Sequence, residues 1–263
     1  MRQTSSLFLL LVLLSCSSTG SDISVRVVST QAHLVSGGDA LIEVVTSPSW
    51  GDDELRVTIN GEGRPVPFRH APAARGTSAY RGLVEGLRIG ENTIEVEGNL
   101  GSTEILVVNY PITGPIISGP HLEPYFCLSE LSPGRDGAPR EFAIGNGESL
   151  DDASIDESCS LPTRVDYVYR STKDDGAFLA LPDAGGRPAD LASVKTIEGV
   201  EAPYIVRIET GTINRAIYQT AILHDPTGEA TSALAPPEAW NGRLVYTYGG
   251  GCEAGFFQGS STG

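Results

Sequence analysis

The chain has 263 residues, of which 40% are hydrophobic and only 19% are charged, a composition typical of a folded globular protein. Its 33 acidic and 18 basic residues give a net charge of −15 at pH 7. This excess of carboxylates argues against nucleic acid as a partner, because phosphates need a basic surface. The overall charge also disfavours peripheral binding to anionic lipid, and it indicates a well-solvated acidic surface.

Residues 1–15 are typical of a secretory signal peptide. Arg2 supplies a positive charge and is followed by the apolar run Leu7–Leu14. A helix that spans a bilayer needs about 20 apolar residues, so this run is too short to span but has the length of a signal-peptide core. We therefore expect the protein to be exported.

The stretch Leu13–Cys16 resembles the lipobox of bacterial lipoproteins, in which the cysteine is diacylated and becomes the new N-terminus. The resemblance implies a lipid anchor on Cys16 and a flexible tether over residues 16–22. Two acyl chains would hold the protein stably on a membrane of the cell envelope, at the periplasmic or outer surface. The alternative is an ordinary cleaved signal with Cys16 merely nearby.

Residues 23–112 have the pattern of short β-strands separated by turns. In Thr93–Glu97, apolar and charged residues alternate, the period of a half-buried strand. Asn60-Gly61 is a strong tight-turn signal. Further strands are expected over Asp39–Val45, Leu55–Ile59 and Ser102–Val108. About seven such strands would suit an immunoglobulin-like β-sandwich, acting as a scaffold for the next domain or as a binding module.

Residues 113–120 are rich in Pro and Gly and indicate a domain linker. Beyond it, residues 121–263 form a second region, with strands expected over Val165–Tyr169 and Tyr204–Glu209. Ile213–Leu223 suits a strand or a helix, and we favour a strand that follows a turn at Gly211. A last strand is expected over Leu244–Tyr248.

The cysteines of the chain can form disulfides, since these bonds persist in the oxidising compartments that exported proteins reach. Cys127 and Cys159 flank a loop rich in Gly, Ser and Asp, and we predict that they pair. Cys252 is left without an identified partner. The spacing of these residues is not that of a zinc site, and no metal or other cofactor is expected.

The strand over Leu244–Tyr248 runs directly into Gly249, Gly250 and Gly251. Glycines leave backbone N–H groups free of side-chain cover, so such a loop can approach a reacting oxygen closely. Amides placed in this way can stabilise a developing oxyanion. In α/β-hydrolases a glycine-rich loop after an early strand has this role, although most glycine runs are ordinary turns.

The stretch Pro237–Arg243 followed by the three glycines resembles the tannase and feruloyl-esterase group. Residues 55–263 are similar to a large uncharacterised family of exported bacterial proteins that are regarded as α/β-hydrolases. The stretches that carry this likeness are Arg164–Ser171, Ala202–Tyr218 and Trp240–Gly259. The resemblance implies the β-rich start of a hydrolase domain, a small-molecule ester as substrate, and an oxyanion role for Gly249, Gly250 and Gly251.

Family members are considerably longer, so the resemblance places the nucleophile, acid and base beyond Gly263 and makes this chain an N-terminal portion. One local rival is Ser261, because Gly259–Gly263 fits the nucleophile-elbow pattern, but no helix follows it. His224 and Asp225 are neighbours on an expected strand and should point to opposite faces. The alternative to an enzyme is a cell-surface module that binds glycan or another envelope protein; the oligomeric state is not indicated.

Overall fold

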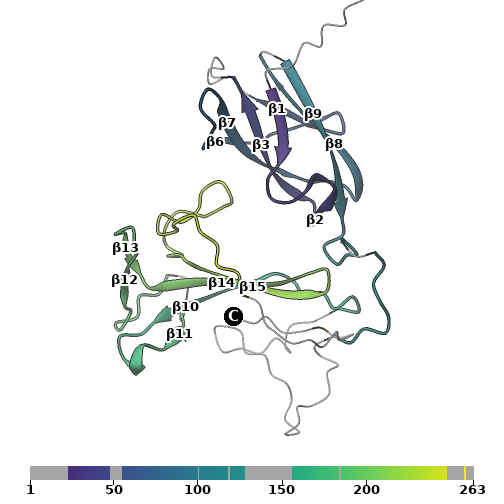
Figure 1. The fold of residues 1–263 in the computed structure, drawn as a ribbon. Helices are drawn as coiled ribbons and strands as arrows, with labels where there is room; N and C mark the ends of the chain where they lie inside the picture. Colours follow the sequence, from purple (N-terminus) through teal and green to yellow (C-terminus); the bar gives the residue numbers. More distant parts are fainter. Residues whose placement is uncertain are drawn as a thin grey trace, which may run out of the picture.

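The computed structural model describes residues 23–47, 55–99, 101–117, 119–127, 156–183, 185–247 and 258. In these ranges the protein is mainly β, as the sequence predicts, and it contains fifteen strands (Figure 1). The helical turns are the 3-10 segments Ala32–Leu34 and Asp174–Gly176. No helix in the described ranges is long and apolar enough to cross a membrane.

Residues 23–110 form two sheets. One is antiparallel, in the order β1-β3-β7-β6, and the other has the order β2-β9-β8-β4-β5, in which β2 runs parallel to β9. The strands of the first sheet are β1 (Ile23–Val27), β3 (Asp39–Thr46), β7 (Ser78–Glu85) and β6 (Phe68–Ala71). Those of the second are β2 (Val35–Ser36), β9 (Gly101–Tyr110), β8 (Gly90–Gly98), β4 (Arg56–Ile59) and β5 (Glu62–Arg64).

The two sheets share one hydrophobic core, because alternate residues of each strand face inward. Ile42 and Val44 of β3 and Val84 of β7 meet Ile94 and Val96 of β8, and all five are fully buried. Burying a side chain of this size contributes roughly 1.5–3 kcal/mol relative to leaving it exposed. The apolar side chains that recur at every second residue therefore pack one sheet against the other.

The strands expected in this region are confirmed, including Thr93–Glu97 within β8. The predicted turn at Asn60-Gly61 is also confirmed: both residues have positive φ, 53° and 83°, and they join β4 to β5. The structure contains nine strands here rather than about seven, because β2 and β5 are too short to leave a clear alternation. An immunoglobulin-like topology stays a prediction.

The second region contains a four-stranded antiparallel sheet in the order β11-β10-β14-β15 and a separate two-stranded ribbon. In Figure 1 these strands, coloured green, form a group apart from the two N-terminal sheets. The sheet consists of β10 (Arg164–Arg170), β11 (Phe178–Ala180), β14 (Ile205–Ile213) and β15 (Ala216–Leu223). The ribbon consists of β12 (Ser193–Lys195) and β13 (Glu201–Pro203). A hydrolase-like arrangement stays a prediction.

Two sequence predictions in this region are wrong. Gly211 does not lie in a turn: it pairs with Tyr218 inside the β14–β15 hairpin, and the ring of Tyr218 occupies the space where a side chain would stand. The chain reverses instead at Asn214 and Arg215, both with positive φ. Leu244–Thr247, the described part of the last expected strand, is not in a strand, and Leu244 and Val245 are more than four-fifths exposed. An apolar run forms a β-strand only where a neighbouring strand can pair with it, and apolar character alone does not ensure such a neighbour.

The predicted disulfide between Cys127 and Cys159 is confirmed, with an S–S distance of 2.02 Å. Both cysteines are buried. The bond joins the segment that follows the Pro/Gly-rich residues 113–120 to the segment that precedes β10. It therefore closes the stretch between residues 127 and 159 at its base.

Candidate functional site

The residues that the sequence singles out for chemistry lie outside the described ranges. These are Gly249, Gly250, Gly251, Cys252 and Ser261, together with Cys16 of the expected anchor. The described residues nearest to the glycine run are Thr247 before it and Gln258 after it.

Gln258 is a buried polar residue that fixes the chain after the glycine run. Its backbone N–H donates to the carbonyl oxygen of Phe126 at 2.8 Å. Its side-chain amide donates to the carbonyl oxygens of Cys159 at 2.7 Å and Arg215 at 2.9 Å. Gln258 itself is thus attached both to the disulfide and to the β14–β15 turn. Nothing in the sequence pattern indicated this role, because a single glutamine carries no periodic signal.

Before the glycine run, the stretch Trp240–Arg243 forms a compact turn. The indole Nε1 of Trp240 donates to the carbonyl oxygen of Arg243 at 2.9 Å, and the backbone N–H of Arg243 donates to the side chain of Asn241 at 3.1 Å. Gly242 lies between them with a φ of 72°, a conformation that favours glycine. Trp240, Asn241 and Gly242 therefore each have a local structural reason that does not depend on any catalytic role.

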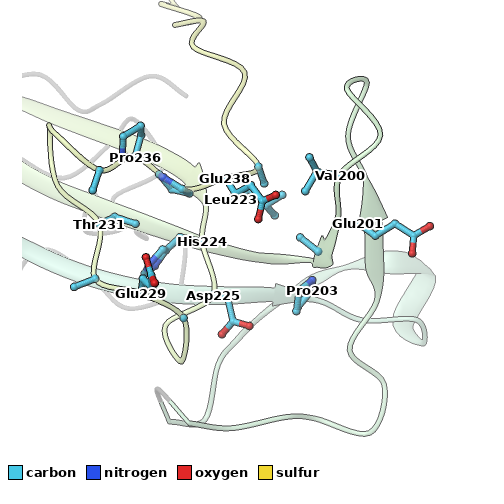
Figure 2. A pocket seen from close by; sticks show the side chains of 16 residues that line it. Val200, Glu201, Pro203, Leu223, His224, Asp225, Glu229, Thr231, Pro236 and Glu238 are labelled. Carbon is cyan, nitrogen blue, oxygen red and sulfur yellow. The ribbon is translucent and has the colours of Figure 1, made fainter. Parts of the chain in front are cut away.

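A cavity of about 400 Å³ lies beside this stretch, where β13 and β15 end (Figure 2). It is lined by residues 200–203, 223–225, 228–231 and 235–239. The last of these segments leads directly into the Trp240–Arg243 turn. The wall at His224 is attached to the start of β14, because the backbone N–H of His224 donates to the carbonyl oxygen of Ile205 at 3.0 Å.

His224 is the titratable ring in the cavity wall. Its Nδ1 lies 3.1 Å from the hydroxyl oxygen of Tyr167, which β10 contributes, and the two ring centroids are 5.8 Å apart. Its Nε2 is buried and has no hydrogen-bond partner in the described part of the chain. A buried imidazole nitrogen without a partner costs free energy.

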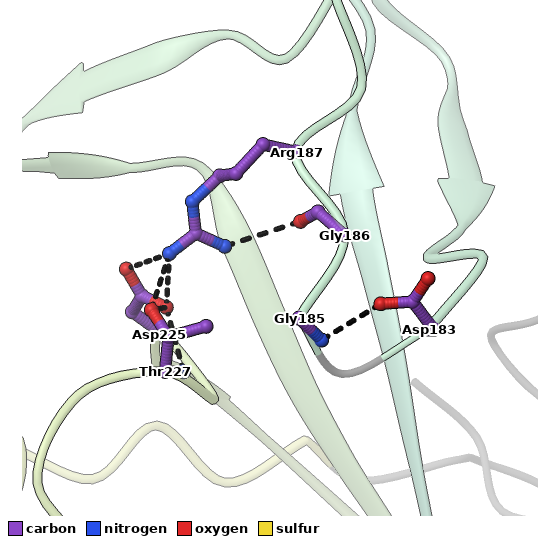
Figure 3. Close-up of polar contacts among 6 residues, drawn as sticks. All are labelled: Asp183, Gly185, Gly186, Arg187, Asp225 and Thr227. Atoms are coloured by element: carbon purple, nitrogen blue, oxygen red, sulfur yellow. Dashed lines mark hydrogen bonds and ion pairs between the residues drawn. The ribbon is translucent and has the colours of Figure 1, made fainter.

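Asp225, the next residue, has different partners. The Arg187 guanidinium lies 2.7 Å from both of its carboxylate oxygens, and the backbone N–H of Thr227 donates to it at 2.9 Å (Figure 3). Burial raises the pKa of Asp225, but hydrogen bonds from Thr227 and Arg187 outweigh it and hold the pKa below its ordinary value. Asp225 is therefore a carboxylate that fastens the loop at the cavity's edge, and it does not orient His224.

The lining of the cavity is acidic and partly apolar. Glu201, Glu229 and Glu238 contribute carboxylates, and prolines and alanines contribute apolar surface. Figure 2 shows the carboxylates of Glu201 and Asp225 pointing away from His224. Such a lining admits neutral or cationic groups and repels anions. No group of three or more His, Cys, Asp or Glu residues in the described ranges is placed to hold a metal ion.

The chain matches one protein-family model along nearly all of its length. The model of the "Tannase-like family of unknown function (DUF6351)" matches residues 25–263. No curated protein matches the chain. One solved structure that matches is an uncharacterized protein of Listeria monocytogenes EGD-e, in complex with glucose, magnesium and calcium, at 12% identity and a TM-score of 0.20. The match covers 68% of this chain and 12% of that one, and a TM-score this low does not indicate a shared fold.

Proposed function

Because the chain belongs to the tannase-like family of unknown function, we propose that it supplies the N-terminal part of an exported ester hydrolase. The observation that carries this proposal is the family match over residues 25–263, together with the glycine run that follows the Trp240–Arg243 turn. In the proposed reaction, water cleaves a carboxylic ester into an acid and an alcohol. Backbone amides of Gly249, Gly250 and Gly251 would stabilise the oxyanion that forms on the ester carbonyl.

The cavity at His224 supports a role in admitting the substrate. It borders residues 235–239, which lead into the turn before the glycine run. Its carboxylates favour a neutral ester over the carboxylate product, so they would help the acid product to leave. The nucleophile, acid and base of the reaction are not assigned to residues of this chain.

The test of this function is turnover by the full-length natural protein. A panel of carboxylic esters, including methyl gallate and methyl ferulate, would be assayed alongside labelling of the folded protein by a fluorophosphonate probe. We expect hydrolysis of at least one ester and labelling of a serine. Valine at position 250 would keep the backbone N–H, but its branched side chain would displace that amide or cover it. Gly250→Val should therefore lower kcat by up to roughly a hundredfold, the loss seen when one oxyanion donor is removed.

A matched control is Gly63→Ala in β5, where an added Cβ meets no atom within 4 Å, and it should leave kcat unchanged. Folded protein that neither turns over any ester nor reacts with the probe would refute the hydrolase. Glycan binding without turnover would instead favour a cell-surface binding module.

Export and lipid anchoring through Cys16 are part of the same proposal. The buried Cys127–Cys159 disulfide supports export, since such bonds persist in oxidising compartments. Cells that express the full chain should show it in the membrane fraction, and Cys16→Ser should move it to the soluble fraction. Incorporation of labelled palmitate that Cys16→Ser abolishes would support the anchor. Equal membrane association of both forms without acylation would refute it.

A further inference from the structure

A row of arginines crosses the outer face of the β1-β3-β7-β6 sheet. Arg26 of β1 lies opposite Glu43 of β3, Glu43 lies opposite Arg81 of β7, and Arg81 lies opposite Arg69 of β6. Residues directly opposite one another in an antiparallel sheet project from the same face. We call Arg26, Arg69 and Arg81 the arginine row. It faces away from the core, since the neighbours of Glu43 on β3 are core residues.

Glu43 does not neutralise the row. Glu43 is 2% exposed, and its carboxylate accepts hydrogen bonds from Arg26 Nε at 3.0 Å and from Arg81 Nε at 2.9 Å. Burial raises the pKa of Glu43, but the bonds from Arg26 and Arg81 outweigh it and lower the pKa below its ordinary value. Glu43 is therefore ionised at neutral pH, and its single negative charge leaves the three arginines with a surplus of positive charge.

The row also keeps unused hydrogen-bond donors. Arg81 bonds Glu43 only through Nε, and the side chains of Arg26 and Arg81 are 68% and 41% exposed. Arg69 is exposed and has no ion pair among the described residues. Like charges directly opposite in a sheet, as at Arg69 and Arg81, are destabilising, and a bound anion would offset that cost. Guanidinium groups bind phosphate through paired hydrogen bonds.

The position of the row relative to Cys16 suggests which anion it meets. Strand β1 begins at Ile23, and the tether between Cys16 and Ile23 can reach at most about 25 Å when fully extended. Ile23 pairs with Thr46 at one end of the sheet, and the row crosses β3 at Glu43, three residues from Thr46 and four from Asp39. The acidic pair Asp39 and Glu85 lies at the opposite end. The basic part of this face is thus the part closer to the tether.

We propose that the arginine row faces the headgroups of anionic phospholipids and so orients the anchored protein on the membrane. This inference rests on the proposed Cys16 anchor, which supplies the adhesion that a chain of net charge −15 lacks. A tethered acidic protein at an anionic surface has its lowest electrostatic energy when its least acidic part is turned toward that surface. On this face the arginine row balances the carboxylates of Glu43, Asp39 and Glu85. The β1-β3-β7-β6 sheet would then lie against the bilayer, and the β2-β9-β8-β4-β5 sheet would face outward.

The experiment measures orientation on vesicles of phosphatidylcholine, with or without phosphatidylglycerol. The mature chain, with Cys252→Ser, is coupled through Cys16 to a maleimide-bearing phospholipid, so the result does not depend on whether cells acylate Cys16. An azide-bearing amino acid at Ala71 of β6 or at Glu104 of β9 carries a fluorophore. Energy transfer to a headgroup-labelled lipid then reports which sheet lies nearer to the membrane.

On vesicles that contain phosphatidylglycerol, transfer from position 71 should exceed transfer from position 104 by about twofold or more at low salt, and high salt should abolish the difference. Arg69→Gln with Arg81→Gln should also abolish it. The matched control is Arg56→Gln with Arg64→Gln, which removes the same charge from the other sheet and should preserve the difference. Equal transfer from both positions, or an unchanged difference in the Arg69/Arg81 variant, would overturn the proposal.

Discussion

The side-chain amide of Gln258 donates a hydrogen bond of 2.7 Å to the carbonyl oxygen of Cys159, a residue 99 positions earlier in the chain. This contact links the two ends of the region that includes the disulfide, the β10-β14-β15 strands and the cavity. A second bond to the carbonyl oxygen of Arg215 makes Gln258 a junction of three segments.

We predict that Gln258→Ala lowers the free energy of unfolding by about 1–3 kcal/mol, because one buried and one partly buried carbonyl oxygen lose their donor. Urea denaturation followed by circular dichroism measures the loss. Gln31→Ala is the matched control: Gln31 is exposed, and its side chain makes no capping hydrogen bond, so stability should change little. Equal stability of Gln258→Ala and the parent protein would contradict the junction.

Glu43 gives a pH-dependent prediction. Because its folded-state pKa is below the ordinary value of 4.5, its contribution to stability is complete above that pH. The contribution is lost as the pH falls through the lowered folded-state pKa. We expect Glu43→Gln to cost about 1.5–3 kcal/mol at neutral pH, the range for hydrogen bonds to a charged group. The cost should shrink in acid, as denaturation at several pH values would show.

The control for this prediction is Glu95→Gln in β8. Glu95 lies directly opposite Glu104 of β9, so removing its charge should be neutral or stabilising at neutral pH. A loss of stability from Glu43→Gln that stays constant from neutral pH to strong acid would show that ionised Glu43 is not the stabilising species.

Gly211 allows a test of packing inside a strand. A Cβ at this position would lie 2.8 Å from ring atoms of Tyr218, whose hydroxyl donates to Glu209 at 3.1 Å. We expect Gly211→Ala to displace the ring and to lower the free energy of unfolding by about 1–3 kcal/mol. Near-ultraviolet circular dichroism should report the altered tyrosine environment. Gly63→Ala, where an added Cβ meets no neighbour, should change neither signal.

The disulfide supplies a prediction about the denatured state. Cys127 and Cys159 are separated by 32 positions, so their bond removes loop-closure entropy from the unfolded chain. Replacing both by serine should lower stability by about 2–4 kcal/mol. Thermal unfolding compares this variant with Cys252→Ser, which leaves the bond intact. A reducing agent should destabilise the Cys252→Ser form and leave the double variant unchanged; the opposite pattern would contradict the assignment.

Strand positions in residues 23–110 could be predicted from the sequence because each strand buries one face, and that burial imposes the alternation seen in Thr93–Glu97. The turn at Asn60-Gly61 could be predicted because its backbone requires positive φ, which these residue types tolerate. The disulfide could be predicted from the export signal and the composition of the loop between its cysteines. These features follow from local chemistry or from the compartment.

The sequence could not place features that depend on contacts between distant segments. Gly211 suggested a turn, but its real constraint is the Tyr218 ring on the next strand. Leu244 and Val245 suggested a strand, but strand pairing needs a neighbour with open hydrogen bonds. The cavity at His224 joins segments that are separate in the chain, and Gln258 acts through carbonyl groups that only folding brings near it.

By itself, then, the sequence determined the β-rich class, most strands of the first two sheets, the Cys127–Cys159 bond and the resemblance to a tannase-like family. The tertiary structure alone decided that Arg26, Arg69 and Arg81 share one row, that His224 meets Tyr167, and that Asp225 pairs with Arg187. The reason is physical: periodicity and turn propensity act between near neighbours in the chain, whereas cross-strand register and burial are set by the whole fold.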